Sequence, residues 1–309
     1  MTRLAPSPTG ALHLGNLRTF LVNWAIAREQ GWRVILRIED LDTPRNKPGA
    51  DRRAISILEW IGIDWDEGPL YQSRDIAVYR EAADALARGG LIYPCAHTRT
   101  EVEAASAPNE GAHEVRFAPE LRPGDISPRL FHFDGRNWRL VTRPGSVSFT
   151  DRFAGDVAFS PYEEVGDFVV WTRRDEPAYQ LAVVVDDARQ GVTHVVRGDD
   201  LLASTARQVL VRRALGIAAE PSYMHLPLVV GGDGRRLAKR HGDTRADSYR
   251  ALGVSPERLI GLIAFWSGIT SRRTTIDLHE FRARLSETNI PRQRIVFTPE
   301  DDHWLKQTH

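Results

Sequence analysis

Apolar residues recur at helix spacing near the start of the chain. In the segment LGNLRTFLVNWAIAREQG they fall on one helical face, at positions Leu17, Phe20, Leu21, Trp24 and Ala25. This spacing predicts a helix that begins near His13, and Gly31 stands where a helix would end. The flanking segments TRLAPSPTG and RVILRIED have strand character, and the second ends in carboxylates. Strand, helix and strand together predict a βαβ unit and a parallel sheet.

The pattern changes along the rest of the chain. Helical spacing continues in ADRRAISILEWIG and VYREAADALARGG, but residues 95–161 are rich in Pro, Gly and short polar turns, with β-like pieces at RNWRLVT and GSVSFTDRF. We expect an inserted small domain there. The α/β pattern resumes with DFVVWT, YQLAVVVDD and VTHVVRGDD, followed by a helix over LLASTARQVLVRRALG. After HLPLVVGGDG the sequence becomes helical, and Ser255 is a plausible N-cap with Pro256 at the first helical position.

Composition narrows the class of protein. The chain has 309 residues, with 42% hydrophobic and 27% charged residues, typical of a globular protein with more than one domain. Lys plus Arg equals Asp plus Glu at 41 each, so a polyanion would have to meet a local basic face. One Cys and two Met exclude a disulfide scaffold and fit a reducing compartment. The N-terminus has no apolar signal region, and the stretch LIGLIAFW is too short to span a bilayer. These features predict a cytoplasmic protein that does not enter membranes.

The segment APSPTGALHLGN, residues 5–16, has the composition of a phosphate-binding turn. It lies between the first predicted strand and the first predicted helix, where backbone N–H groups and the positive helix end favour an anion. His13 is suited to bind a phosphate oxygen, and Gly15 would let a nucleotide approach the backbone. Histidines at helix starts are usually caps or solvated, so the position after the first strand of a βαβ unit is what favours a nucleotide site.

A second segment, GDGRRLAKRHGD at residues 232–243, is a glycine-flanked basic loop. Alone, such a loop is more often a solvated surface. Combined with the His13 turn, it is suited to cover a triphosphate, with Lys239 and Arg240 stabilising charge between the α- and β-phosphates.

These motifs resemble those of the class I aminoacyl-tRNA synthetases. HLGN is similar to their first signature, and RLAKR to their second, a Lys-Met-Ser-Lys-Ser-type loop. RLAPSPTG, RIEDLD, WDEGPLYQS and HVVRGDDLL resemble the glutamyl branch in particular. DTPRNKPGA and YQLAVVVDD resemble its short paralogues, which attach glutamate to the queuosine base of tRNA(Asp). The resemblance runs in order from Arg3 to about Lys239.

The resemblance implies an α/β fold with a Rossmann-like class I catalytic core, an inserted small domain and a helical C-terminal stem-contact element. We predict the first half of the core at residues 1–94 and the inserted domain, of an acceptor- or zinc-binding type, at 95–164. The second half of the core is predicted at 165–230, and the ATP loop with the helical element at 231–309.

The predicted amino-acid site has the side chains that glutamate requires. Two carboxylates call for two arginines, and the ammonium group calls for one acid. Arg3, Glu39 and Arg197 each end a predicted strand of the core, at the edge where open parallel sheets bind ligands. The resemblance assigns to this site Arg3, Ala5, Ser7, Glu39, Tyr179 and Arg197. Surface ion pairs are the alternative interpretation of the arginines.

The resemblance also implies the reaction. The α-carboxylate of L-glutamate attacks the α-phosphorus of ATP, bound with Mg²⁺, and the glutamyl group then passes to tRNA. Catalysis would rest on His13, Gly15 and Lys239. The full predicted ATP set is Pro6, His13, Gly15, Asn16, Arg236, Lys239 and Arg240. In the second signature Arg236 replaces a lysine and keeps its charge, whereas Ala238 replaces a serine and loses a hydroxyl, so we expect activity, at a reduced level if the hydroxyl matters.

The length favours a particular acceptor. Only about seventy residues follow the Lys239 loop, so we expect no anticodon-binding domain and, as in the short paralogues, queuosine-containing tRNA(Asp) as the partner. Three alternatives stay open: a truncated glutamyl-tRNA synthetase that charges the 3′ end, a nucleotidyltransferase that does not act on tRNA, and a silent paralogue that binds only tRNA or glutamate.

Diffuse RNA contacts are expected from eight arginines of the chain. The candidates are Arg212, Arg213, Arg235, Arg236, Arg272, Arg273, Arg292 and Arg294. For each one, a merely solvated surface position is the alternative.

The segment YPCAHTRTE contains the only cysteine. The short paralogues often have a zinc site in the inserted domain, and its spacing falls here on Cys95, His97, Asn109 and His113. Histidine binds zinc as well as cysteine does, but asparagine rarely does. The resemblance therefore implies zinc held by Cys95, His97 and His113. A buried thiol beside two exposed histidines is the alternative.

Overall fold

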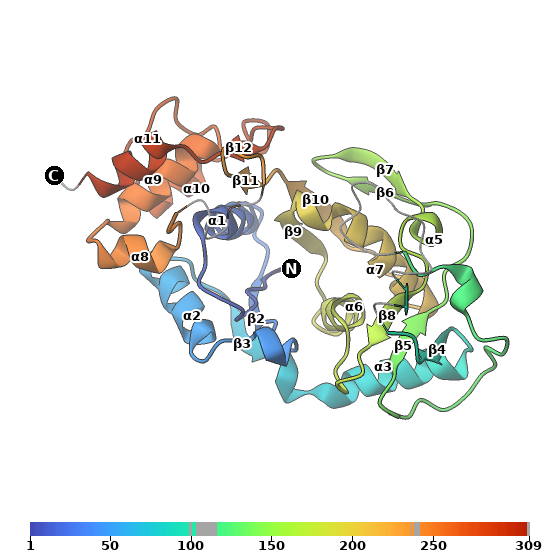
Figure 1. The fold of residues 1–309 in the computed structure, drawn as a ribbon. Coiled ribbons are helices and arrows are strands. Elements are labelled where there is room, and N and C mark those ends of the chain that lie inside the picture. Colours follow the sequence, from blue (N-terminus) through green and yellow to red (C-terminus); the bar gives the residue numbers. More distant parts are fainter. Residues whose placement is uncertain (99–100, 103–115, 236, 238–241, 308–309) are drawn as a thin grey trace. The chain divides into compact units, whose positions relative to one another are not determined.

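The computed structural model describes residues 1–98, 101–102, 116–235, 237 and 242–307. These form two compact units, each built from segments that are distant in the sequence (Figure 1). Unit 1 comprises Met1–Tyr71, Thr193–Leu201 and Tyr223–His309, and unit 2 comprises Gln72–Val192 and Leu202–Ser222. The segment boundaries that the sequence predicts, near residues 94, 164 and 230, stay predictions.

Unit 1 contains the predicted parallel sheet. Strands β1 (Thr2–Leu4), β2 (Val34–Ile38) and β3 (Glu67–Tyr71) pair in parallel in the order β1–β2–β3. Every residue of β2 is buried, as expected for a strand covered on both faces. Two further strands, β9 (His194–Gly198) and β10 (Ser222–Leu226), are neighbours, and β9 contacts β1. Short β11 (Val229–Val230) pairs in parallel with β12 (Ile295–Val296).

The helices of unit 1 include those predicted near the start of the chain and after residue 250. They are α1 (Leu14–Glu29), α2 (Ala50–Trp60), α8 (Ala246–Ala251), α9 (Pro256–Trp266), α10 (Leu278–Arg284) and α11 (Pro299–Lys306). Gly31 follows the end of α1 with φ 67°, a conformation that glycine adopts without strain. The side chain of Ser255 accepts a hydrogen bond from the N–H of Arg258, so the predicted cap of α9 is confirmed. None of the described helices is long and apolar enough to cross a bilayer.

Unit 2 combines helices with antiparallel strands. Its helices are α3 (Ile76–Arg88), α5 (Pro161–Glu164), α6 (Tyr179–Arg189) and α7 (Leu202–Ala214). Its strands are β4 (Ile92–Cys95), β5 (Asn137–Leu140), β6 (Val147–Asp151), β7 (Gly155–Phe159) and β8 (Phe168–Trp171). Strands β4, β5 and β8 form one antiparallel sheet, and β6 and β7 form a hairpin. The β-like pieces predicted between residues 95 and 161 are thus present as β5 and β6.

Of the three apolar segments that resume the α/β pattern, the first and third are strands, β8 and β9, and the second is a helix. YQLAVVVDD forms most of α6, although valine is better suited to strands. The helix is buried over several adjacent positions, Gln180 to Val184, because it contacts α3, α7 and β8. Tertiary packing therefore overrides the local preference of these valines.

A buried carboxylate ties together the elements of unit 2. The side chain of Asp167 is fully buried and accepts hydrogen bonds from the hydroxyl of Tyr93 at 2.8 Å and from Nε and Nη2 of Arg122, both at 2.6 Å. It also accepts bonds from the N–H and the hydroxyl of Thr142 at 2.7 and 3.0 Å. Burial, together with this carboxylate, raises the pKa of Tyr93. Hydrogen bonding to Asp167 raises the pKa of Arg122.

We expect Asp167→Ala to lower the free energy of unfolding of unit 2 by about 3–5 kcal/mol, because it leaves several buried donors without their acceptor. Urea denaturation followed by circular dichroism measures the change. Asp125→Ala is the matched control, because the Asp125 side chain is 76% exposed and faces Arg129 at 3.5 Å, a weak surface pair. Equal denaturation midpoints for the two variants would contradict the structural role of Asp167.

Candidate active site

The turn after β1 leads directly to His13, which caps α1. Nδ1 of His13 accepts a hydrogen bond from the backbone N–H of Asn16 at 3.3 Å. A backbone N–H can only donate, so Nδ1 carries no proton and the neutral ring is protonated at Nε2. Nε2 is therefore a hydrogen-bond donor, suited to an oxygen of a phosphate. The cap and the predicted phosphate contact thus use different nitrogens of one ring.

Gly15 is required where α1 comes close to β11. A Cβ atom at this position would lie 3.3 Å from Nδ1 of His13 and 3.4 Å from Cβ of Val229. Both distances are shorter than most contacts of a Cβ atom, so a larger residue would displace the His13 ring or the strand. Glycine thus preserves the cap geometry as well as access to the backbone.

The structure places described residues in and after the basic loop close to the His13 turn. Leu14 donates its N–H to the carbonyl of Thr244 at 3.0 Å, and Ala246 donates to the carbonyl of Leu12 at 2.9 Å. Within the basic loop, Leu237 is buried and donates to the carbonyl of Val229 at 3.4 Å. Leu237 and the residues that follow the loop, Thr244 and Ala246, are therefore anchored near His13 and Gly15. Arg236, Ala238, Lys239 and Arg240 lie outside the described residues, so the roles predicted for them stay predictions.

An ion pair holds the segment that follows the basic loop. Nε and Nη2 of Arg245 donate to the two carboxylate oxygens of Asp243 at 2.6 and 2.5 Å, and the Ser248 hydroxyl donates to Asp243 at 2.7 Å. These bonds lower the pKa of Asp243, with Arg245 as the main cause, and Asp243 in turn raises the pKa of Arg245. Immediately after this turn, the backbone of Arg245 forms an isolated antiparallel β-bridge with the backbone of His13.

Five of the six residues predicted for glutamate lie in unit 1. Arg3, the middle residue of β1, and Arg197, in β9, are 4% and 5% exposed, and Nη1 of Arg3 lies 3.5 Å from the carbonyl oxygen of Val196. Both arginines are thus buried on contacting strands, so the surface ion-pair alternative is wrong for them. Arg3 and Arg197 each precede the end of their strand by one residue, whereas the sequence predicts that they end it.

Glu39 lies one residue beyond the end of β2, where the sequence predicts it at the strand end itself. Its N–H donates to the carbonyl of Pro6 at 3.1 Å, which brings it next to the segment that contains Ala5 and Ser7. Its carboxylate pairs with the buried Arg37 at 3.2 Å, a contact that the sequence did not predict. A carboxylate accepts several hydrogen bonds, so this pair is compatible with a second donor such as an ammonium group.

Tyr179, the sixth predicted residue, is the first residue of α6 in unit 2 and is 39% exposed. A residue that the sequence analysis missed is His225 in β10, which is 2% exposed and accepts a hydrogen bond from Nε of Arg197 at 2.9 Å. A histidine inside the apolar strand pattern YMHLPL is the signal that was overlooked.

The predicted zinc ligands are only partly described. Cys95 is free and buried, and it packs with Tyr93, Val102 and Phe117. The His97 side chain is 40% exposed, with Nδ1 at 4.0 Å from the carboxylate of Glu101. His113 and Asn109 lie outside the described residues. Within the part of the chain that the structure describes, no three potential ligands are grouped to hold a metal ion.

The zinc hypothesis therefore stays a prediction. If it is right, elemental analysis should find close to one equivalent of zinc in protein purified without a polyhistidine tag. Cys95→Ser should lose this zinc, because the substitution removes a thiolate ligand. His132→Asn serves as a control histidine substitution within the same segment. Zinc-free wild-type protein after expression in zinc-supplemented medium would refute the hypothesis.

Several of the arginines proposed to contact RNA have partners within the protein. Arg212 is 3% exposed and donates to the carbonyl of Ala219 at 2.7 Å, so its prediction as a surface contact is wrong. Arg213 faces Glu220 at 3.9 Å, and Arg294 faces Asp199 at 3.4 Å. Arg236 lies outside the described residues. Arg235, Arg272 and Arg292 are exposed.

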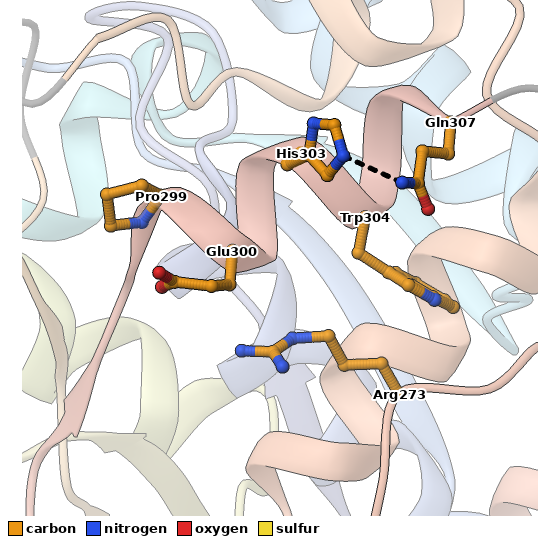
Figure 2. A pocket seen from close by; sticks show the side chains of 6 residues that line it. All are labelled: Arg273, Pro299, Glu300, His303, Trp304 and Gln307. Carbon is orange, nitrogen blue, oxygen red and sulfur yellow. Dashed lines mark hydrogen bonds between the residues drawn. The ribbon is translucent and has the colours of Figure 1, made fainter.

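Arg273 lines a cleft of about 450 Å³ in the C-terminal helical part of unit 1 (Figure 2). One face of α11 supplies most of the lining, with Pro299, Glu300, His303, Trp304 and Gln307. Nε of Arg273 donates to the buried Asp301 at 2.7 Å, and His303 and Gln307 are hydrogen-bonded at 2.7 Å. The cleft contains none of the residues predicted to bind ATP or glutamate.

Comparison with known proteins identifies the family. The family model described as "tRNA synthetases class I (E and Q), catalytic domain" matches residues 1–291, and the chain belongs to this family. Two curated relatives are glutamyl-Q tRNA(Asp) synthetases. The one from Rhodopirellula baltica is 46% identical over 90% of each chain. The one from Symbiobacterium thermophilum is 43% identical over 95% of this chain and 94% of the relative.

More distant relatives are named glutamate–tRNA ligases. The one from Oleidesulfovibrio alaskensis is 37% identical over 99% of this chain but 65% of its own length. The solved glutamate–tRNA synthetase from Elizabethkingia anophelis is 25% identical, with a TM-score of 0.80 over 98% of this chain and 69% of that chain. The predicted fold class, an α/β protein with a Rossmann-like class I core, is confirmed.

Proposed function

We propose that this chain activates L-glutamate with ATP and transfers the glutamyl group to the queuosine base in the anticodon loop of tRNA(Asp). The observation that carries the proposal is the identity of 46% with a glutamyl-Q tRNA(Asp) synthetase over nine tenths of both chains. The glutamate–tRNA ligases are less similar, at 37% for the relative from Oleidesulfovibrio alaskensis. Membership of the class I synthetase family supports an aminoacyl-tRNA synthetase type of ligase that uses ATP with Mg²⁺.

In the first step the α-carboxylate of glutamate attacks the α-phosphorus of ATP. A bond forms between a carboxylate oxygen and the α-phosphorus. The bond between the α-phosphorus and the oxygen that bridges it to the β-phosphorus breaks, and pyrophosphate leaves with the electron pair of that bond. Nε2 of His13 donates to a phosphate oxygen, and the cations of the basic loop, Lys239 and Arg240, neutralise charge on the leaving group. Mg²⁺ accompanies ATP and screens the phosphates. No protein nucleophile is needed, because positioning and charge stabilisation supply the catalysis.

Recognition of glutamate rests on Arg3, Arg197 and Glu39. The two guanidinium groups bind the substrate carboxylates, and the Glu39 carboxylate pairs with the ammonium group. Burial of both arginines supports this role, because buried guanidinium groups form stronger ion pairs than exposed ones. Ala5, Ser7 and Tyr179 complete the proposed glutamate site, and Pro6, Gly15, Asn16 and Arg236 the proposed ATP site.

In the second step a hydroxyl of the acceptor attacks the glutamyl carbonyl, and AMP leaves. We propose a hydroxyl of the queuosine cis-diol as this nucleophile. Charging of the tRNA 3′ end is the second candidate acceptor reaction. The observation that supports it is the 37% identity to a glutamate–tRNA ligase over nearly the whole chain. A zinc site in the inserted segment and a cytoplasmic location stay predictions.

Two measurements test the proposal. Glutamate-dependent exchange of pyrophosphate into ATP tests the activation step. If no exchange occurs at any glutamate concentration, the proposal that this chain is an enzyme is overturned. Transfer of labelled glutamate to tRNA(Asp) tests the acceptor, with tRNA(Asp) that lacks queuosine as the matched control. We expect transfer only to the queuosine-containing tRNA. Equal transfer to both forms would establish the 3′ end as the acceptor instead.

A further inference from the structure

We infer that His225 is a positioning residue that sets the plane of the Arg197 guanidinium for glutamate binding. This inference rests on the proposed function, in which Arg197 binds a carboxylate of the substrate. Arg197 lies in β9 and His225 in β10, two neighbouring strands of unit 1. The contact is between Nε of Arg197 and Nε2 of His225, at 2.9 Å, and both side chains are buried.

The chemistry of this contact fixes the state of His225. A guanidinium group has only donors, so Nε2 of His225 must accept and carries no proton. The neutral ring is then protonated at Nδ1, and an imidazolium would place two donors against each other. The ring of Tyr223, two residues earlier in β10, is stacked on His225 with centroids 6.3 Å apart. Tyr223 is itself 3% exposed, so the imidazole is supported by a packed neighbour.

Two contacts at different nitrogens define the plane of the guanidinium. Nε donates to His225, and Nη2 lies 3.5 Å from the carbonyl oxygen of Leu201. Bidentate recognition of a carboxylate requires two N–H groups in one plane with the carboxylate oxygens. Without the acceptor at Nε, the guanidinium is less firmly held in this plane. Loss of the His225 contact should therefore weaken carboxylate binding without removing any charge from the site.

The test compares variants of the full chain that remove or keep the acceptor. In His225→Leu the acceptor is lost, and we expect KM for glutamate in pyrophosphate exchange to rise about 10- to 100-fold, the range for a hydrogen bond to a charged group. KM for ATP should stay within about two-fold, because His13 and the basic loop are untouched. His225→Gln offers an amide oxygen to Nε and should restore KM for glutamate to within a few-fold of the wild-type value.

A double-mutant cycle separates positioning from general damage. If His225 acts through Arg197, His225→Leu should add nothing to the defect of Arg197→Leu. Two outcomes would overturn the inference: a double variant whose KM defect is the product of the two single defects, or an unchanged KM for glutamate in His225→Leu. In either case pyrophosphate exchange by the wild-type protein would still support the proposed function. Wild-type protein without exchange would overturn both. If His225→Leu fails to fold, His225→Asn, whose amide is too short to reach Nε, takes its place with the same expected outcomes.

Discussion

His13→Asn is expected to lower glutamate-dependent pyrophosphate exchange by about 100- to 1000-fold while the thermal unfolding temperature stays almost unchanged. Asparagine is among the best N-cap residues, so its side-chain oxygen can replace Nδ1 as the acceptor for the N–H of Asn16. Its amide does not extend to the position of Nε2, so the donor to the phosphate oxygen is lost. Removal of one such donor costs about 100- to 1000-fold in other enzymes.

Steady-state exchange and differential scanning calorimetry measure the two effects. His13→Ala is the control, because it loses the cap as well as the donor. We expect the same loss of exchange together with a destabilisation of about 1 kcal/mol. Exchange within ten-fold of the wild-type rate in His13→Asn would show that the imidazole serves only as a cap.

Arg197→Leu is expected to raise KM for glutamate by at least about 100-fold. Leucine fills much of the buried volume but removes two charge-assisted hydrogen bonds to the substrate, each worth about 1.5–3 kcal/mol. KM for ATP should change little. Loss of the hydrogen bond from Arg197 to the buried His225 costs some stability. A far-ultraviolet circular dichroism spectrum and an unchanged KM for ATP must therefore accompany the measurement.

Arg33→Leu is the matched control for Arg197→Leu. Arg33 belongs to the same unit, but its side chain is 61% exposed and pairs with Glu67 at 3.4 Å on the surface. We expect its substitution to leave both KM values unchanged. A similar rise in KM for glutamate in both variants would mean that Arg197 affects the protein generally and is not a ligand of the substrate.

The sequence predicted features that depend on local signals. The periodicity of α1, the glycine that follows it and the Ser255 cap of α9 are all determined by residues within a few positions of one another. The burial of Arg3 and Arg197 agrees with the amino-acid site that the resemblance implies. The order of the motifs also predicted the fold class, because strand, helix and strand allow few topologies.

Other features depend on tertiary contacts, whose partners no local pattern specifies. The valines of α6 favour a strand locally, but packing against α3 and α7 makes the segment a helix. Arg212 is buried, and the carbonyl of Ala219, seven residues later, accepts its hydrogen bond. His225 and Arg197 are 28 residues apart and meet only because their strands are neighbours. Periodicity does not specify which strands are neighbours, so this contact required the structure.

Backbone hydrogen bonds couple the chain after the basic loop to the start of α1. Thr244 accepts a hydrogen bond from the N–H of Leu14, and Ala246 donates one to the carbonyl of Leu12, so the two partners lie on either side of His13. A displacement of Thr244 and Ala246 would therefore break these bonds or move the residues next to His13. The geometry of the histidine cap and the path of the chain after the loop are thus mechanically linked through the backbone, without any side-chain contact.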